Sequence, residues 1–315
     1  MDPSNPESFN HRSALLSTGR TYHFVDQVPK GYDSKLNPTL LCVHGFPDLW
    51  YGWRHQIGPW VRHGLRVVAP DMLGYGGTSK PTDPAEYTTS KTCADLVALL
   101  ELLEVQKAVL IGHDWGSAIV GRFALWYPER ILALVMISVP YSPPARKYIP
   151  LEEIIKKAPN LGYQAYFASE QSTEEIDSHE GSFRDLILDN RERKHRLVLT
   201  PQEFSYYNEQ LSQGMRGPLN YYRTTKLRFD EEKAANLPSH LRDDLPFLFI
   251  YGTEDGTVVK PVLEKSKKFI KRYQEIVLEG RGHWLMVEAK DEFTEKIASW
   301  LEGLTSLNLE RQSKL

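Results

Sequence analysis

The chain has 315 residues, of which 41% are hydrophobic, 25% charged and 11% aromatic. This length suggests roughly two domains of about 150 residues, or one large α/β domain, and it suffices for a buried core without disulfides or structural metals. The 38 basic and 41 acidic residues leave a net charge of −3, which argues against nucleic acid or an anionic membrane as a partner.

Short apolar runs rich in β-branched residues, each followed by a turn signal, predict six strands. They cover residues 39–44, 65–71, 107–112, 132–138, 247–252 and 275–279. Runs that are apolar throughout suit strands covered on both faces. Between two of them, residues 91–105 place Ala94, Val97 and Leu100 on one helical stripe. The alternation of strand and helix predicts an α/β fold with a mostly parallel sheet and helices on both faces.

The alternation stops after residue 140. Four prolines at positions 140, 143, 144 and 150 mark the exit from the sheet, and the residues that follow are helical in pattern and rich in charge and tyrosine. We expect residues 141–240 to form an inserted helical cap, or lid. Residues 1–140 and 241–305 then form the two parts of one core, and residues 306–315 form a C-terminal tail.

The most informative segment is Gly112-His-Asp-Trp-Gly116. A predicted strand ends at Gly112, and a helical pattern begins just after Ser117. Small residues at 112, 116 and 117 allow the sharp strand-to-helix turn that lifts one side chain above a sheet, as in the nucleophile elbow of α/β-hydrolases. The usual central serine is replaced by Asp114. By itself, the same pattern is also typical of an ordinary helix N-cap.

A carboxylate nucleophile changes the chemistry that the site can perform. It attacks esters poorly, but it can attack a strained or activated sp³ carbon, and the product is an ester whose acyl part is the enzyme itself. Water must then cleave that ester at the Asp114 carbonyl carbon. An aspartate at the elbow therefore indicates epoxides or alkyl halides as substrates.

The remaining members of a triad follow the nucleophile in chain order, first an acid and then a histidine. Asp255 lies just after the strand predicted at 247–252, and His283 lies just after the last one. Both positions are at carboxyl ends of parallel strands, where α/β sites are built. His283 would activate water and Asp255 would orient its imidazole. Glu254 is the competing acid, and the register of the following turn favours Asp255.

An oxyanion site is predicted from the turn His44-Gly-Phe-Pro47. The backbone N–H groups of Phe46 and Trp115 can both point at the Asp114 carboxyl group. The Phe46–Pro47 bond is a candidate cis peptide. No spacing of histidines and cysteines resembles a zinc site, and we expect neither a metal nor a cofactor.

Together, these motifs resemble the soluble epoxide hydrolases of the α/β-hydrolase fold, over about residues 25–305. Two further segments, Tyr163-Gln-Ala-Tyr-Phe167 and Arg216-Gly-Pro-Leu-Asn-Tyr-Tyr-Arg223, resemble the cap motifs of that family. The resemblance implies that Tyr163 and Tyr222 hold the epoxide oxygen. It also implies that Phe46, Trp115 and Gln164 line the substrate cavity. Tyr166 and Tyr221 are the neighbouring tyrosines with which the pair could be confused.

The function expected from these residues is addition of water to an epoxide through a covalent ester on Asp114. The main alternative is a haloalkane or haloacid dehalogenase, which needs halide donors such as a Trp pair or Trp–Asn. Trp115 could supply one donor, but position 46 is Phe. A non-catalytic receptor with a hydrolase-like fold is a further alternative. The near-neutral net charge of the chain suggests that its substrates are small uncharged epoxides.

Several sequence features outside the predicted site indicate where in the cell the protein is located. We see no secretory signal, no apolar run near the ~20 residues of a membrane span, and two cysteines, Cys42 and Cys93, in apolar surroundings that predict reduced interior thiols. The chain ends in Ser313-Lys314-Leu315, which matches the address read by a peroxisomal import receptor. We expect a soluble peroxisomal or cytoplasmic protein, and the patterns do not predict its oligomeric state.

Overall fold

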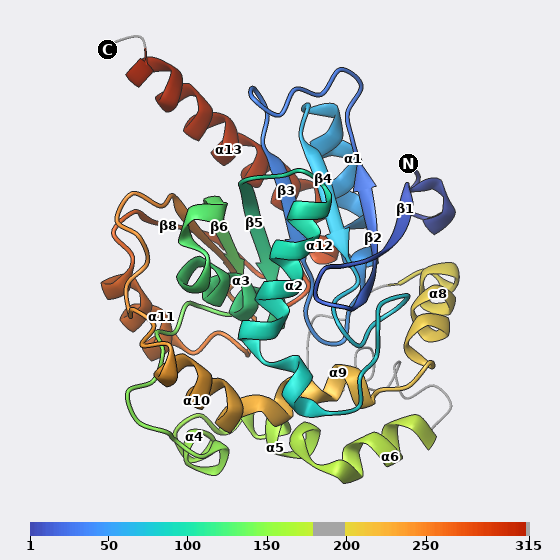
Figure 1. Ribbon diagram of the computed structural model, residues 1–315, viewed down its shortest axis with the longest axis vertical. Helices are drawn as coiled ribbons and strands as arrows, with labels where there is room; N and C mark the ends of the chain where they lie inside the picture. The colour runs from blue at the N-terminus through green and yellow to red at the C-terminus, as the bar shows by residue number, and fades with distance from the viewer. Residues whose placement is uncertain (179–198, 313–315) are drawn as a thin grey trace.

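An eight-stranded sheet forms the centre of the computed structural model, which describes residues 1–178 and 199–312, with side chains up to residue 304 (Figure 1). The strand order is β1-β2-β4-β3-β5-β6-β7-β8. β1 and β2 are antiparallel to their neighbours, and the pairs from β4 to β8 are parallel. The strands are β1 His11–Leu15, β2 Thr21–Gln27, β3 Thr39–Val43, β4 Arg66–Pro70, β5 Ala108–His113, β6 Ile131–Ile137, β7 Phe247–Gly252 and β8 Tyr273–Leu278.

All six predicted strands are present, as β3 to β8, so the α/β fold with a mostly parallel sheet is confirmed. The continuous apolar runs of the central strands bury side chains on both faces: every residue of β3 and β5 is buried, and each fully buried Leu or Ile contributes roughly 1.5–3 kcal/mol. The edge strand β8 is mostly exposed or partly buried. The antiparallel strands β1 and β2 were not predicted. β2 alternates between buried and partly exposed residues for most of its length, and β1 is mostly exposed, so neither strand has a continuous apolar run.

Helices cover both faces of the sheet (Figure 1). α2 and α3 pack against each other, with α3 against β5 and β6, while α1, α12 and α13 pack together and α1 lies against β4. The helix predicted at 91–105 corresponds to α2. The helices of the core are α1 Arg54–Arg62, α2 Thr89–Leu102, α3 Trp115–Trp126, α11 Lys260–Ser266, α12 Leu285–Glu288 and α13 Lys290–Gln312.

Between β6 and β7 the described residues form further helices, which gather at the end of the sheet where the parallel strands have their carboxyl ends (Figure 1). Side-chain hydrogen bonds fasten α8 to the core. Among them, Arg54 Nε donates to Glu203 Oε1 at 2.8 Å, and the Tyr207 hydroxyl donates to Asp48 Oδ1 at 2.8 Å. These helices are α4 Leu151–Lys157, α5 Tyr163–Ala168, α6 Glu170–Ser178, α8 Pro201–Leu211, α9 Arg216–Asn220 and α10 Thr225–Ala234.

The structure bears on two smaller expectations, and a third lies outside the described residues. Cys42 and Cys93 are free and buried, which confirms the prediction of interior thiols. Within the described residues, no helix combines the length and the apolar character needed to cross a membrane. Ser313-Lys314-Leu315 lie outside the described residues, so the targeting signal remains a prediction.

Candidate functional site

Asp114 lies on a sharp turn between β5 and α3. β5 ends at His113, α3 begins at Trp115, and Asp114 has φ +53°, a left-handed conformation that is costly for a residue with a Cβ. The turn brings the backbone of β3 and α3 very close together. A Cβ on Gly116 would lie 2.0 Å from the carbonyl oxygen of Val43, so position 116 requires glycine. The geometry is that of an elbow, with the Asp114 carboxylate presented above the sheet.

Both carboxylate oxygens of Asp114 have neighbours. The Phe46 backbone N–H donates to Oδ1 at 2.8 Å, and Oδ2 lies 3.6 Å from His283 Nε2. Burial raises the pKa of Asp114, but His283 and the Phe46 N–H outweigh it, and the pKa lies below its ordinary value. The buried side chain is therefore an ionised carboxylate at neutral pH. The Phe46–Pro47 bond is cis, as the sequence suggested.

His283 lies between two carboxylates. Its Nδ1 is 3.0 Å from Asp255 Oδ2, while its Nε2 faces Asp114. Burial lowers the pKa of His283, but the charge of Asp255 and the interactions with Asp114 raise it to about 10. The pKa of Asp255 is strongly lowered: burial opposes this shift, and His283 and Thr257 produce it. The structure thus brings Asp255, rather than Glu254, against the imidazole.

Two further histidines lie behind the site as neutral groups. His44 Nε2 accepts the Met72 backbone N–H at 2.9 Å, and burial lowers the pKa of His44 to about 4. His113 Nε2 donates to the His283 carbonyl oxygen at 2.9 Å, and burial lowers the pKa of His113 to about 3. His113 therefore holds the backbone of His283, and His44 joins the turn before Phe46 to the segment that follows β4.

A cavity of about 230 Å³ lies beside Asp114. It is lined by four of the other predicted site residues, which come from three separate segments of the chain. Apolar and small side chains supply most of the remaining wall. The described lining residues are Asp114, Trp115, Ala118, Val139, Pro140, Ser142, Leu161, Tyr163, Gln164, Tyr222, Arg228, Thr257, Val259 and Val262. Phe46 lies behind this wall, with its ring 5.2 Å from the ring of Tyr222.

The structure separates Tyr163 and Tyr222 from their sequence neighbours. Tyr163 and Tyr222 line the cavity. The hydroxyl of Tyr221 donates to the Leu73 carbonyl oxygen at 3.0 Å, and Tyr166 is exposed, with its hydroxyl on Glu175 at 2.7 Å. Burial and the Asp114 charge raise the pKa of Tyr222 well above its ordinary value, so the phenol keeps its proton.

Comparison with known proteins is consistent with this arrangement. A family model described as the alpha/beta hydrolase fold matches residues 38–290. Epoxide hydrolase 3 of Siraitia grosvenorii is 32% identical, over 84% of this chain and 92% of that protein. The chain belongs to the epoxide hydrolase family of the α/β-hydrolase fold. A crystal structure of an epoxide hydrolase from Vigna radiata superposes with a TM-score of 0.83 at 27% identity, over 95% of this chain and 99% of that one.

Bifunctional epoxide hydrolase 2 of Mus musculus is 30% identical over 95% of this chain. The chain spans 57% of the length of that relative. The similarity therefore concerns one part of the mouse protein.

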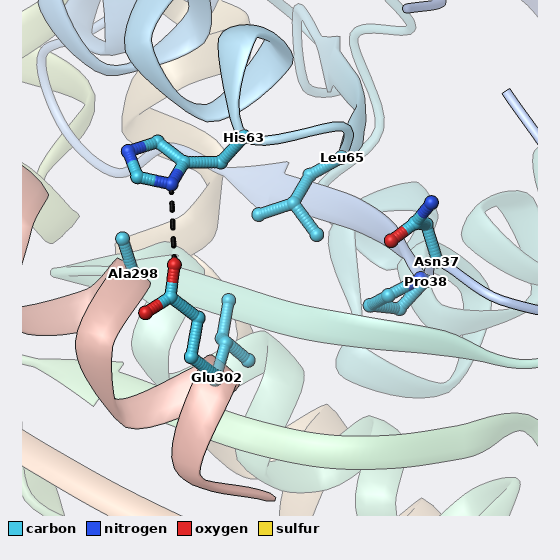
Figure 2. A pocket seen from close by; sticks show the side chains of 7 residues that line it. Asn37, Pro38, His63, Leu65, Ala298 and Glu302 are labelled. Carbon is cyan, nitrogen blue, oxygen red and sulfur yellow. Dashed lines mark hydrogen bonds and ion pairs between the residues drawn. The ribbon is translucent and has the colours of Figure 1, made fainter. Parts of the chain in front are cut away.

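A second hollow lies far from Asp114, at the amino ends of β3 and β4, where Asn37 and Leu65 precede the two strands (Figure 2). Its volume is about 210 Å³. The imidazole of His63 meets Glu302 of α13 at 3.2 Å in its wall, and both side chains are largely exposed. It contains none of the predicted site residues, and its walls hold no aligned nucleophile and base.

Thr257 and Arg228 are among the residues at the site that were not predicted from the sequence. The Thr257 hydroxyl donates to Asp255 Oδ1 at 2.7 Å, and the Thr257 backbone N–H donates to the same oxygen at 2.8 Å. A threonine two residues after an aspartate is a signal for such a turn, so Thr257 could have been found. Arg228 lines the cavity from α10, and no local motif marks it.

The raised pKa of His283 predicts how stability depends on pH. The folded protein holds the proton up to about pH 10, whereas the unfolded chain releases it near its ordinary pKa of about 6.5. The free energy of unfolding should therefore fall as pH rises from about 6.5 to about 10, because the folded state binds more protons there. Urea unfolding of the protein and of His283→Gln across this range measures the effect. An equally steep fall in the variant would contradict the assignment.

Proposed function

We propose that this protein is an enzyme that adds water to epoxides and releases vicinal diols. One observation carries the proposal: a carboxylate at the elbow, Asp114, shares a cavity with two phenols, Tyr163 and Tyr222. An epoxide needs a nucleophile at carbon and an acid at oxygen, because ring opening produces an alkoxide, which is a poor leaving group. Membership of the epoxide hydrolase family supports the same reaction.

The first step forms a covalent ester. Asp114 attacks the less hindered epoxide carbon, the carbon–oxygen bond of the ring breaks, and a phenol protonates the oxygen that leaves. Asp114 Oδ1, which already accepts the Phe46 N–H, becomes the carbonyl oxygen, and Oδ2 forms the new bond. Tyr163 and Tyr222 polarise the ring oxygen, and Gln164 and Trp115 contact the rest of the substrate.

The second step hydrolyses that ester. His283 takes a proton from water, and the resulting hydroxide attacks the Asp114 carbonyl carbon. The N–H groups of Phe46 and Trp115 stabilise the oxyanion, typically by about 10²–10³ in rate for each donor. The tetrahedral intermediate collapses to the carboxylate, and the diol oxygen that leaves is protonated from the imidazolium of His283. The phenolate regains its proton from solvent.

The charges explain why His283 can serve as a base only after the first step. In the resting site, Asp255 and Asp114 hold the pKa of His283 at about 10, so its imidazole is protonated. Formation of the ester removes the Asp114 charge, and the pKa of His283 falls because one of its two anionic neighbours is lost. The proton of His283 passes to solvent, and the neutral imidazole is then available to activate water. The proton released when the Asp114 carboxylate is restored returns to His283.

We propose that the helices between β6 and β7 form a cap, with residues 141–240 inserted between core segments 1–140 and 241–305. They supply Tyr163, Gln164 and Tyr222 to a cavity whose nucleophile comes from the core. The contacts of Glu203 and Tyr207 with core side chains support this closed arrangement.

The proposal is tested with a panel of aliphatic, styrene-type and trans-disubstituted epoxides, read as chiral diols, with alkyl halides as controls. We expect diol from at least one epoxide class and no halide release. Halide release without epoxide turnover would support dehalogenase chemistry at the same aspartate instead. Absence of both reactions would support a non-catalytic receptor.

Removing the phenolic hydroxyls should slow ring opening. We expect Tyr163→Phe and Tyr222→Phe each to reduce kcat/KM for an epoxide, and the double variant to reduce it by about 10²–10⁴-fold, the usual contribution of general acid catalysis. Single-turnover kinetics measures the first step directly. Tyr166→Phe, at an exposed tyrosine, is the matched control. Full activity of the double variant would exclude these two acids.

A further inference from the structure

Arg228 is a charged residue in the cavity that the two-step reaction does not use. It belongs to α10 and is the one basic side chain among the described lining residues. Its guanidinium lies over the indole of Trp115, with 4.9 Å between Cζ and the ring centroid. Trp115 directly follows Asp114 in the chain. Arg228 therefore packs on the residue next to the proposed nucleophile.

The guanidinium has few partners of its own. Its Nε donates to the Thr224 hydroxyl at 2.9 Å. Glu232, one helical turn further along α10, attracts Arg228 but is bound by Arg122 Nε at 2.6 Å. Among the residues that the structure describes, no carboxylate forms an ion pair with Arg228. The two terminal nitrogens are therefore left for a group that enters the cavity.

Arg228 is partly buried and lines the cavity, so its charge meets less water than at an open surface and a group that enters the cavity can reach it. Burial lowers the pKa of Arg228 to about 10, which still leaves the side chain charged at neutral pH. A charged group that loses water needs a charged or hydrogen-bonding partner to compensate. Stacking on Trp115 supplies part of this compensation, but a planar fork of N–H donors is satisfied best by a carboxylate.

We propose that Arg228 binds a carboxylate of the substrate, so that the preferred substrates are small epoxides that carry a carboxylic acid group. This inference rests on the proposed function and deepens it. A single guanidinium matches a single negative charge, which favours a carboxylate over a doubly charged phosphonate. We expect the acid group to lie near Arg228, because the negative charge of Asp114 repels it. The net charge of −3 describes the whole chain and not the cavity, where Arg228 supplies a positive charge. This proposal therefore replaces the earlier expectation of uncharged substrates with substrates that carry one negative charge.

The test compares a series of terminal epoxy carboxylates of increasing chain length, each paired with its primary amide, which has nearly the same shape and no charge. In the wild-type protein we expect kcat/KM for the acid to exceed that for the amide by about tenfold or more at one or more chain lengths. In Arg228→Gln this ratio should fall to about one or below, and in Arg228→Lys it should be intermediate. Arg216→Gln, which removes a half-exposed cation that does not line the cavity, should retain the wild-type ratio.

Binding gives a readout that does not require turnover. Hexanoate should bind the wild-type protein more tightly than hexanamide in calorimetry, and Arg228→Gln should remove the difference. Equal kcat/KM for acid and amide at every chain length in the wild-type protein would overturn the inference, as would an unchanged ratio in a folded Arg228→Gln. If the epoxide rings of the epoxy amides are opened but the epoxy acids are not preferred, only this inference fails. If no epoxide is hydrolysed, the proposed function fails, and the hexanoate measurement still decides whether Arg228 binds a carboxylate.

Discussion

Replacing Asp114 by alanine is expected to reduce epoxide hydrolysis by at least about 10⁴-fold, which is the scale of loss when a catalytic nucleophile is removed. The physical reason is that no other described side chain in the cavity can form the ester. Steady-state diol formation measures the loss. Asp243→Ala removes an exposed aspartate that pairs with Lys271, and this control should remain fully active. Diol formation by Asp114→Ala at a rate close to wild type would exclude covalent catalysis at this residue.

Labelling with heavy-oxygen water should show that the new diol oxygen comes from Asp114. With enzyme in excess over epoxide in heavy-oxygen water, the diol of the first turnover should contain no label, because its new oxygen comes from the Asp114 carboxylate. The label should instead enter Asp114 and appear in the diol of later turnovers. Full labelling of the first diol would show direct attack by water, and Asp114 would then act as a base.

Replacing His283 by glutamine is expected to separate the two steps. Ring opening needs the carboxylate and the phenols, whereas hydrolysis of the ester needs a base within reach of Asp114, and His283 Nε2 lies 3.6 Å from Asp114 Oδ2. The variant should therefore still form the ester but release diol more slowly by about 10²–10⁴-fold, the contribution of a general base.

Intact-protein mass spectrometry measures this outcome directly. Incubated with an epoxide, His283→Gln should gain the mass of one epoxide molecule, and peptide mapping should place the gain on Asp114. The double variant with Asp114→Ala should gain nothing. His63→Gln, at the exposed imidazole that meets Glu302 (Figure 2), should turn over without accumulating ester. Absence of any mass gain in His283→Gln would mean that the imidazole is also needed for the first step.

The part of the site that the sequence predicted is the part built from local backbone geometry. Gly112 and Gly116 flank Asp114 because neither position has room for a Cβ: the Cβ of Gly112 would lie 2.3 Å from the Gly116 carbonyl oxygen. A turn this tight restricts residue types within a few positions, so it leaves a recognisable motif. Asp255 and His283 could be located for a related reason, since each directly follows a strand that a continuous apolar run predicts.

The local sequence pattern does not show which of the two adjacent tyrosines, Tyr221 or Tyr222, enters the cavity. Tyr221 and Tyr222 are adjacent and chemically identical in the sequence, and a resemblance to a family motif is what separated them. In the structure, the turn Tyr221–Thr224 directs one phenol to the Leu73 carbonyl oxygen and places the other beside Asp114 in the cavity. Such a choice depends on how this turn is rotated against the core.

The sequence by itself therefore determined the parallel sheet, the aspartate at the elbow and the order of its partners, because short-range sterics and strand burial restrict the residues involved. Only the tertiary structure decided that Arg228 faces the same cavity as Asp114. Arg228 lies more than a hundred positions from Asp114, and packing alone brings it over Trp115. Long-range packing leaves no periodic pattern around a single arginine, so the charge that would select the substrate becomes visible only when the chain is folded.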